Sequence, residues 1–240
     1  MRRIIFTWFL LISIFFLVSN TLNGGWGYGV TGASNYIWRG FDLNPDRQPV
    51  LQPFVAYGFG DSGVALELWG SVSFESREAN EIDLTLSYTG KLAGCFFFQA
   101  GLIHYGWYFT EGFSFDRDTT QEVFLTVSCA SCRIQPRFTV FYDFANGDGV
   151  YLQADMAYPF EISRDLSALL SLSAGYNGGQ WLPAGAETGL SDVNLGLALV
   201  YRTGNWRISP FAMLTMTLLE ALGEENYVWV GLKLEYAPGE

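Results

Sequence analysis

Charged side chains recur within segments that alternate between apolar and polar residues, and they are the first candidates for chemistry. Alternation with a period of two places such charges on the face opposite the apolar side chains. The basic members of this set are Arg39, Arg133, Arg137, Arg207 and Lys233, and the acidic members are Glu67, Asp83, Glu122, Asp143, Asp155 and Glu235. Because an unpaired charge in a narrow interior is costly, this near-balanced set predicts either ion pairs that stabilise the fold or a pore lining that selects solutes.

Three cysteines offer a second kind of chemistry. The spacing Cys129-Ala-Ser-Cys132 matches a redox motif, but that motif normally opens a helix in a βαβ unit, whereas here it lies in a turn between predicted strands. A zinc site would need more Cys or His ligands nearby. In an oxidising compartment we predict a disulfide between Cys95 and Cys129, at the ends of neighbouring strands. A bridge between Cys129 and Cys132 is the alternative, and either leaves one thiol over.

Catalysis has few candidate residues. The chain has one histidine, His104, and no serine in a context that marks a nucleophile. We therefore predict no enzyme activity and interpret His104 as a residue of an aromatic girdle. No glycine-rich phosphate loop lies between a strand and a helix, and no cofactor or metal is predicted. The net charge of −11 argues against nucleic acid, whose binders carry basic patches.

The elements that must position these residues are strands. Leu66 and Leu68, for example, alternate with Glu67 and Trp69. The pattern recurs near residues 26–37, 49–59, 64–74, 81–89, 95–108, 120–129, 132–144, 150–161, 167–176, 191–202, 206–218 and 227–236. Segments of ~9–11 residues fit a transmembrane strand. The fold class is therefore all-β, an antiparallel transmembrane β-barrel of about 12 strands within a range of 10–14. A soluble sandwich is the alternative.

Two further patterns favour the barrel. Alternate connectors, beginning with residues 38–48, are mostly longer than those between them, as expected for outer loops and periplasmic turns. Aromatic residues gather at strand ends, where they predict interfacial girdles. They are Trp26, Tyr36, Trp38, Tyr57, Phe59, Tyr142, Phe144, Tyr158, Tyr176, Tyr201, Trp206 and Tyr236.

The two ends of the chain predict its destination. Met1-Arg2-Arg3, the apolar run from Ile4 to Val18 and the polar residues after it form the three regions of a signal peptide. We assign residues 1–23 to the signal peptide and residues 24–240 to the barrel. An uncleaved N-terminal anchor is the alternative. The C-terminal segment Gly231–Tyr236 is similar to the assembly signal of outer-membrane barrels. The predicted location is the bacterial outer membrane, and the predicted partners are its lipid and the barrel-assembly machinery.

The heptapeptide Ser34-Asn-Tyr-Ile-Trp-Arg-Gly40 is the most distinctive motif of the sequence. It resembles the motif S-D-Y-[VI]-[FW]-R-G on the first strand of a bacterial barrel family of the TorF or Gcw-chp type. The resemblance covers about a quarter of the chain, and the remainder agrees only in layout. It implies an outer-membrane barrel with no established activity. Asn35 stands where that family usually has Asp, so an ion pair between that Asp and Arg39 would be absent here.

Arg39 is predicted to face inward where the first strand meets the first outer loop. A buried guanidinium needs partners, and Glu67 and Asp83 are candidates. Bulky inward residues narrow the predicted lumen, and outer loops of moderate length predict no large folded plug. The bulky residues are Trp69, Phe124, Phe141, Phe211 and Trp229.

The predicted function is a narrow channel for small polar or charged solutes, with weak cation preference from the acidic loops. A non-conducting structural or adhesive barrel is the alternative, and a membrane-embedded enzyme comes third.

Overall fold

The computed structural model describes residues 25–44, 48–74, 81–107, 119–223 and 225–237. The predicted signal peptide, residues 1–23, lies outside this part of the chain. Strands make up nearly all of the regular structure, with two single 3-10 turns, η2 (Gly60–Ser62) and η3 (Glu220–Leu222). Among the described residues, no helix has the length and apolar character needed to cross a membrane.

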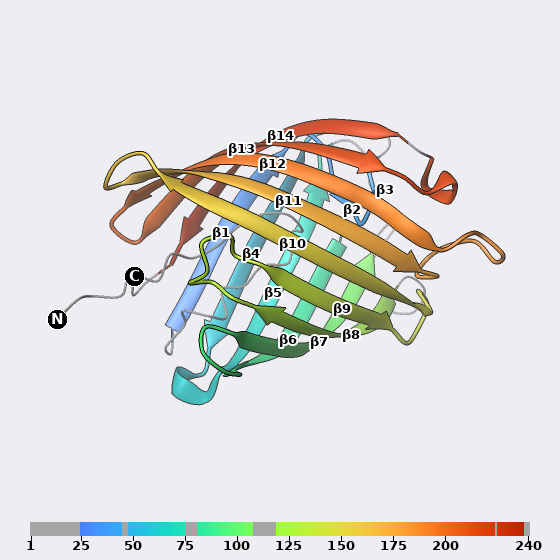
Figure 1. Ribbon diagram of the computed structural model, residues 1–240, viewed down its shortest axis with the longest axis horizontal. Coiled ribbons are helices and arrows are strands. Elements are labelled where there is room, and N and C mark those ends of the chain that lie inside the picture. The colour runs from blue at the N-terminus through green and yellow to red at the C-terminus, as the bar shows by residue number, and fades with distance from the viewer. Residues whose placement is uncertain (1–24, 45–47, 75–80, 108–118, 224, 238–240) are drawn as a thin grey trace.

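Twelve antiparallel strands of the described chain close into a barrel (Figure 1). They are β1 (Gly25–Ala33), β4 (Val50–Gly58), β5 (Val64–Ser73), β6 (Glu81–Lys91), β7 (Phe97–Trp107), β8 (Thr119–Ser128), β9 (Arg137–Asp143), β10 (Gly149–Glu161), β11 (Leu166–Gly178), β12 (Gly189–Thr203), β13 (Trp206–Thr217) and β14 (Asn226–Tyr236). Each strand pairs with its neighbours in sequence, and β1 closes the ring against β14, from Tyr28 opposite Tyr236 to Ala33 opposite Gly231. The predicted all-β barrel is confirmed.

The connections distinguish the two ends of the barrel. The end where β1 begins and β14 finishes carries the short connections, residues 59–63, 92–96, 129–136, 162–165 and 204–205. Most connections at the other end are longer, beginning with residues 34–49. Short periplasmic turns and longer extracellular loops are the rule for outer-membrane barrels, so we name the two ends accordingly.

The alternation of side chains separates lipid from lumen. On β5, Leu66 and Leu68 are 38% and 45% exposed on the outer face, whereas Ala65 and Trp69 are each only 4% exposed on the inner face. The same period of two holds along the other strands, where most exposed large apolar side chains alternate with buried polar ones. An apolar exterior around a polar interior is the arrangement that a bilayer requires of a barrel.

Aromatic rings cluster at the periplasmic end, where β1, β4, β13 and β14 meet. Tyr28 stacks on Tyr236 with 4.9 Å between ring centroids. The ring centroids of Trp26 and Tyr57 are 4.8 Å apart. Rings at this level suit the membrane interface. Tyr36 and Trp38, which the sequence pattern predicts to be girdle residues, are instead buried inside the barrel.

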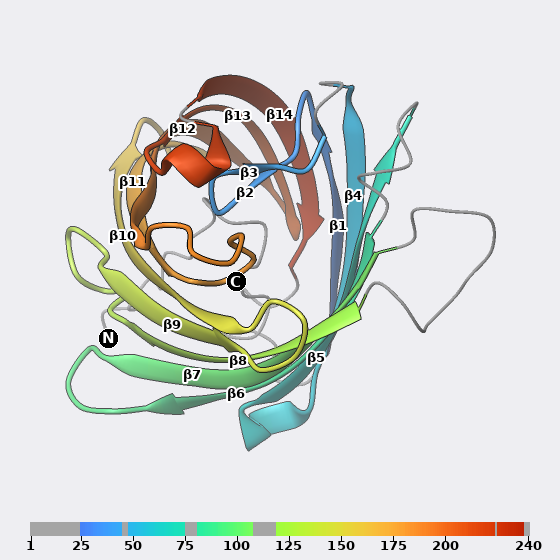
Figure 2. The same cartoon turned by 90° about the vertical axis from the view of Figure 1, so that its right-hand side faces the viewer.

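The first predicted strand is too long because the chain turns inward after Ala33. A separate hairpin follows, in which β2 (Ile37–Trp38) pairs with β3 (Phe41–Asp42). Figure 2 looks into one end of the barrel and shows this hairpin within the ring of strands. The sequence predicts no large plug, and it does not predict this smaller hairpin either. Alternation continues through it, so the sequence pattern does not reveal the change of direction.

The hairpin turn has a local cause in the motif itself. Arg39 and Gly40 are the two central residues, with φ of 52° and 85°. A two-residue hairpin of type I′ requires positive φ at both positions, which glycine adopts freely and arginine rarely. The pair Arg39-Gly40 therefore defines a tight hairpin.

Candidate functional site

The hairpin crosses the extracellular mouth of the lumen. At its base, the Ser34 amide donates to the Val230 carbonyl over 2.9 Å, and the Val230 amide donates to Ser34 Oγ over 3.0 Å. At its tip, Gly40 accepts a hydrogen bond from Thr217 Oγ1 over 3.3 Å. The base therefore rests on β14 and the tip reaches β13, while the Arg39 side chain extends to the far wall.

Arg39 is the centre of a buried polar cluster. Its guanidinium donates to both carboxylate oxygens of Glu122 on β8, over 2.6 and 2.9 Å, and to Gln180 Oε1. Gln180 Nε2 and Tyr105 Oη also donate to Glu122, over 2.6 and 2.9 Å. Gln180 belongs to the connection between β11 and β12, so two outer loops meet at one carboxylate. The partner of Arg39 is Glu122 rather than Glu67 or Asp83.

Aromatic faces enclose the same guanidinium. Its central carbon lies 4.0 Å from the ring centre of Phe141 and 4.6 Å from those of Trp38 and Tyr151. Cation–π contacts of this kind strengthen when they are desolvated. Burial is the largest single influence on the pKa of Arg39 and lowers it, but the charge and hydrogen bonds of Glu122 together with Tyr105 and Tyr151 raise it by more, so the pKa lies above its ordinary value and the group stays charged.

Carboxylates dominate the extracellular half of the lumen. Besides Glu122, the described chain buries Glu81, Asp83, Asp143 and Asp192 there, against the single buried cation Arg39. Hydroxyl groups satisfy several of them. Tyr36 Oη donates to Glu81 over 2.7 Å, Thr120 Oγ1 to Asp143 over 2.6 Å, and Tyr151 Oη to Asp192 over 2.7 Å.

The periplasmic half of the lumen is balanced and wetter. Arg137 pairs with Asp155 over 2.9 Å, and their side chains keep 11% and 9% exposure. Arg207 and Lys233 both lie 3.6 Å from Glu235, and the Lys233 side chain keeps 12% exposure. Glu67 also faces inward, between the outward Leu66 and Leu68, and interacts electrostatically with Lys233. Charge pairs in this half therefore retain contact with water.

Ten of the eleven predicted lumenal residues lie inside the barrel, and Arg133 does not. Arg133 is exposed in the connection between β8 and β9, with its guanidinium carbon 5.7 Å from the Tyr158 ring centre. The prediction failed because β9 begins at Arg137, five residues later than residue 132. Glu81 and Asp192 were missed, although their parity on predicted strands offered a signal. Gln180 lies in a loop that carries no such signal.

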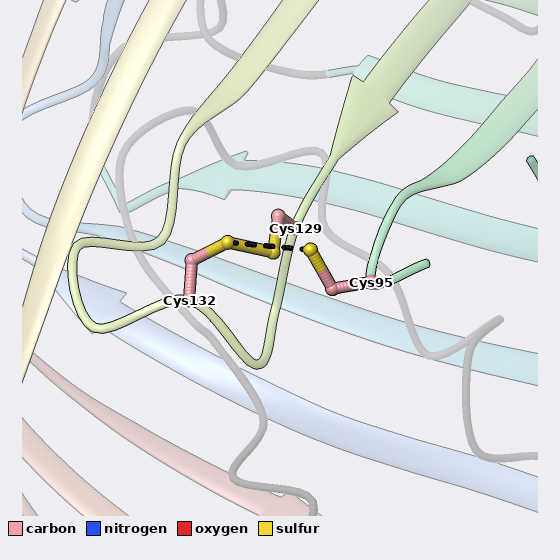
Figure 3. A group of neighbouring side chains, drawn as sticks. All are labelled: Cys95, Cys129 and Cys132. Atoms are coloured by element: carbon pink, nitrogen blue, oxygen red, sulfur yellow. Dashed lines mark hydrogen bonds between the residues drawn. A yellow bond between two sulfur atoms is a disulfide. The ribbon is translucent and has the colours of Figure 1, made fainter. Parts of the chain in front are cut away.

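The disulfide in the structure joins Cys129 to Cys132, which was the alternative, and the predicted bridge between Cys95 and Cys129 is wrong (Figure 3). The connection between β8 and β9 is longer than predicted and folds back, so the two Cα atoms lie 5.6 Å apart, within the range for a bridge. Cys95 is a half-buried free thiol.

His104 lies on the outward side of β7. Its Nδ1 is 3.0 Å from Gln121 Nε2 on β8. This position agrees with a residue near the membrane interface.

No family model and no curated protein matches this sequence. Among solved structures, the chain is similar to the KdgM porin, with a TM-score of 0.60 and 11% identity over 89% of this chain and 99% of that one. It is similar to the NanC porin, with a TM-score of 0.55 and 12% identity over 88% and 98% of the two chains. It is also similar to LpxR from Salmonella typhimurium, with a TM-score of 0.52 and 9% identity over 88% of this chain and 99% of that one.

These comparisons agree with the geometry. Identities this low show the fold, and that fold is the closed barrel of outer-membrane proteins. The chain is a transmembrane β-barrel of the bacterial outer membrane.

Proposed function

We propose that the barrel is a narrow channel for small polar or charged solutes, with the inward hairpin setting its constriction at the extracellular mouth. The observation that carries this proposal is the periplasmic half of the lumen. Its charged pairs lie inside the barrel but keep measurable exposure, as Arg137 and Lys233 illustrate. A lining built only for stability has no need of water contact at its ion pairs. The similarity to two porins supports the same function.

We further propose that the channel favours cations over anions. The described extracellular half buries five carboxylates and one guanidinium, and acidic rings are a common lining of cation-conducting pores. Arg39 is already paired with Glu122, which leaves Asp143 and Asp192 without a compensating buried cation in the described part of that half. The preference then arises inside the mouth and adds to the loop acidity.

Conductance of the purified barrel in a planar lipid bilayer tests the channel directly. We expect discrete, small current steps, because a barrel of twelve strands lies between filled small barrels and wide porins. A boiled sample, in which the barrel is unfolded, serves as the control. Folded protein that inserts without any current steps would refute the channel.

A non-conducting structural or adhesive barrel is the second candidate. The observation that favours it is the hairpin itself, which crosses the mouth and is fixed by the buried pair of Arg39 and Glu122. If the hairpin seals the lumen, the intact barrel carries no current and a barrel without the hairpin does. Removal of the hairpin therefore separates a constriction from a seal.

Catalysis stays outside the proposal, since His104 contacts Gln121 on the outer side of the sheet. For assembly, we propose that β14 carries the signal recognised by the barrel-assembly machinery. Its segment Gly231–Tyr236 pairs with β1 and closes the ring. Membership of the TorF or Gcw-chp type family also remains a proposal, which rests on residues 34–40.

A further inference from the structure

Three sulfur atoms gather at the periplasmic end of the barrel. Cys95 lies in the turn between β6 and β7, and Cys129 and Cys132 lie in the connection between β8 and β9. The three Sγ atoms all lie within 4.8 Å of one another, and Figure 3 shows Cys95 pointing toward the disulfide. These are the three cysteines of the whole chain, so every sulfur capable of bridging is in one place.

The backbone holds this cluster in position. The Cys129 amide donates to the Pro136 carbonyl over 3.0 Å, and Gln135 Nε2 donates to the Ala130 carbonyl over 2.8 Å. Phe97, at the start of β7, is directly opposite Ser128, at the end of β8. Cys95 and Cys129 therefore flank the last paired residues of two hydrogen-bonded strands, and the approach of the sulfurs follows from the sheet.

The contact between Cys95 and the disulfide has a defined direction. The Sγ atoms of Cys95 and Cys132 are 3.5 Å apart. Cys132 has no thiol hydrogen, because it is bonded to Cys129, so the thiol of Cys95 is the donor. A thiol in contact with a disulfide sulfur can begin thiol–disulfide exchange once it loses its proton and its side chain turns to approach in line with the S–S bond.

We propose that the three cysteines form an exchange site, in which the Cys95 thiolate attacks Cys132 Sγ and moves the bridge between turns. The new bond joins Cys95 to Cys132. The Cys129–Cys132 bond breaks, its electron pair leaves on Cys129 Sγ, and Cys129 takes up the proton that Cys95 released. The reaction is an isomerisation, so it needs neither an oxidant nor a reductant.

The product suits its surroundings. Cys129 is 0% exposed, and a neutral buried thiol behaves as a small apolar side chain. The original bridge spans a sequence separation of 3 residues, whereas the new one spans 37. Closing a longer loop restricts the unfolded chain more strongly. The moved bridge thus joins the β6–β7 turn to the β8–β9 connection and fastens the base of the β7–β8 strand pair.

A metal ion is a poorer occupant of this cluster. A soft metal is held by thiolates, and two of the three sulfurs are already bonded to each other. The oxidising environment at the periplasmic end maintains that bond. Exchange, in contrast, uses the sulfurs in the oxidation state that the structure contains.

The position of the free thiol tests the exchange. Full-length protein is isolated without reductant, quenched in acid to stop exchange, unfolded and labelled with a maleimide. Trypsin cuts after Arg117 and separates Cys95 from the peptide that carries Cys129 and Cys132. We expect label on both Cys95 and Cys129, together with a cross-linked pair of peptides. Label on Cys95 alone, with no cross-linked pair, would overturn the proposal.

Two variants make the result specific. Cys95→Ser should carry no label and no cross-link, since only the local bridge remains. Cys129→Ser retains Cys95 and Cys132, and we expect them to form the cross-link and raise the unfolding midpoint above that of the double variant Cys95→Ser/Cys129→Ser. Two free thiols in folded Cys129→Ser would show that the sulfurs cannot bond, and would reject the exchange.

Discussion

The extracellular and periplasmic halves of the lumen differ in how their charged side chains are paired and buried. In the extracellular half, one guanidinium is enclosed by a carboxylate, an amide and three aromatic rings, and its side chain is 3% exposed. In the periplasmic half, Arg137 pairs with Asp155 and Lys233 with Glu235, and the two basic side chains keep 11% and 12% exposure. The first arrangement fixes a structural element in place, whereas the second lines a space that water reaches.

This difference separates two roles that look alike in the sequence. The alternating pattern predicts that Arg39, Arg137 and Arg207 all face inward. Only Arg39 belongs to a loop that folds into the barrel. A buried, multiply bonded charge is expected to govern stability, and a partly hydrated one is expected to tune the passage of ions.

Removal of the hairpin should have the largest effect. Ala33 pairs directly with Val50, so a two-residue Asn-Gly turn in place of residues 34–49 should close the same strands. Glu122→Gln is added, because the carboxylate would otherwise lose its cation. We expect a several-fold increase in single-channel conductance, measured in planar bilayers.

The control for this experiment is Glu122→Gln with the hairpin intact. Barrel folding of both proteins is checked by the different gel mobility of heated and unheated samples. Equal conductance of the two proteins would mean that the hairpin is neither the constriction nor a seal.

Arg39→Ala should destabilise the barrel strongly, since removing one partner of a buried ion pair costs about 3–5 kcal/mol. Arg137→Ala is the matched variant in the other half and should cost clearly less, because its pair is partly exposed. The comparison uses the midpoint of urea unfolding in detergent micelles, followed by tryptophan fluorescence. The double variant Arg39→Ala/Glu122→Gln should recover part of the loss. Similar midpoints for the two alanine variants would remove the distinction between the halves.

The same residues show how much of the fold and of the lumenal site could be predicted from the sequence. The walls obey a period of two, so the alternation of Leu66, Glu67 and Leu68 was enough to assign the fold and most of the inner face. The hairpin depends on the positive φ of Arg39 and Gly40, and the pairing with Glu122 joins residues 83 apart in sequence. No local pattern carries such a contact. Arg133 failed for a related reason, because the end of a strand is set by hydrogen bonding rather than by alternation.

Gly175→Ala should have a moderate effect on the extracellular half. A Cβ atom at Gly175 would clash with Tyr151 Oη and Asp192 Oδ1, which form a 2.7 Å hydrogen bond. Overpacking of this kind costs about 1–3 kcal/mol. Gly189→Ala is the control, since its Cβ would meet its nearest atom, Leu219 Cδ2, at 3.7 Å. If both variants unfold at the same urea concentration, the close packing at Tyr151 contributes nothing measurable.

The smallest expected effect is on ion selectivity. Asp143 is buried in the extracellular half, and Asp143→Asn keeps the shape of the side chain while removing its charge. The reversal potential across a salt gradient should shift toward anions, and more so at low ionic strength, since salt screens charges over about 10 Å at 0.1 M. Arg207→Gln, in the balanced half, should shift it slightly toward cations. Arg133→Gln is the control, because that side chain lies outside the lumen, and it should leave the potential unchanged. If Asp143→Asn and Arg133→Gln behave alike, the carboxylates of the mouth do not face the path of the ions, and the selectivity must come from the outer loops.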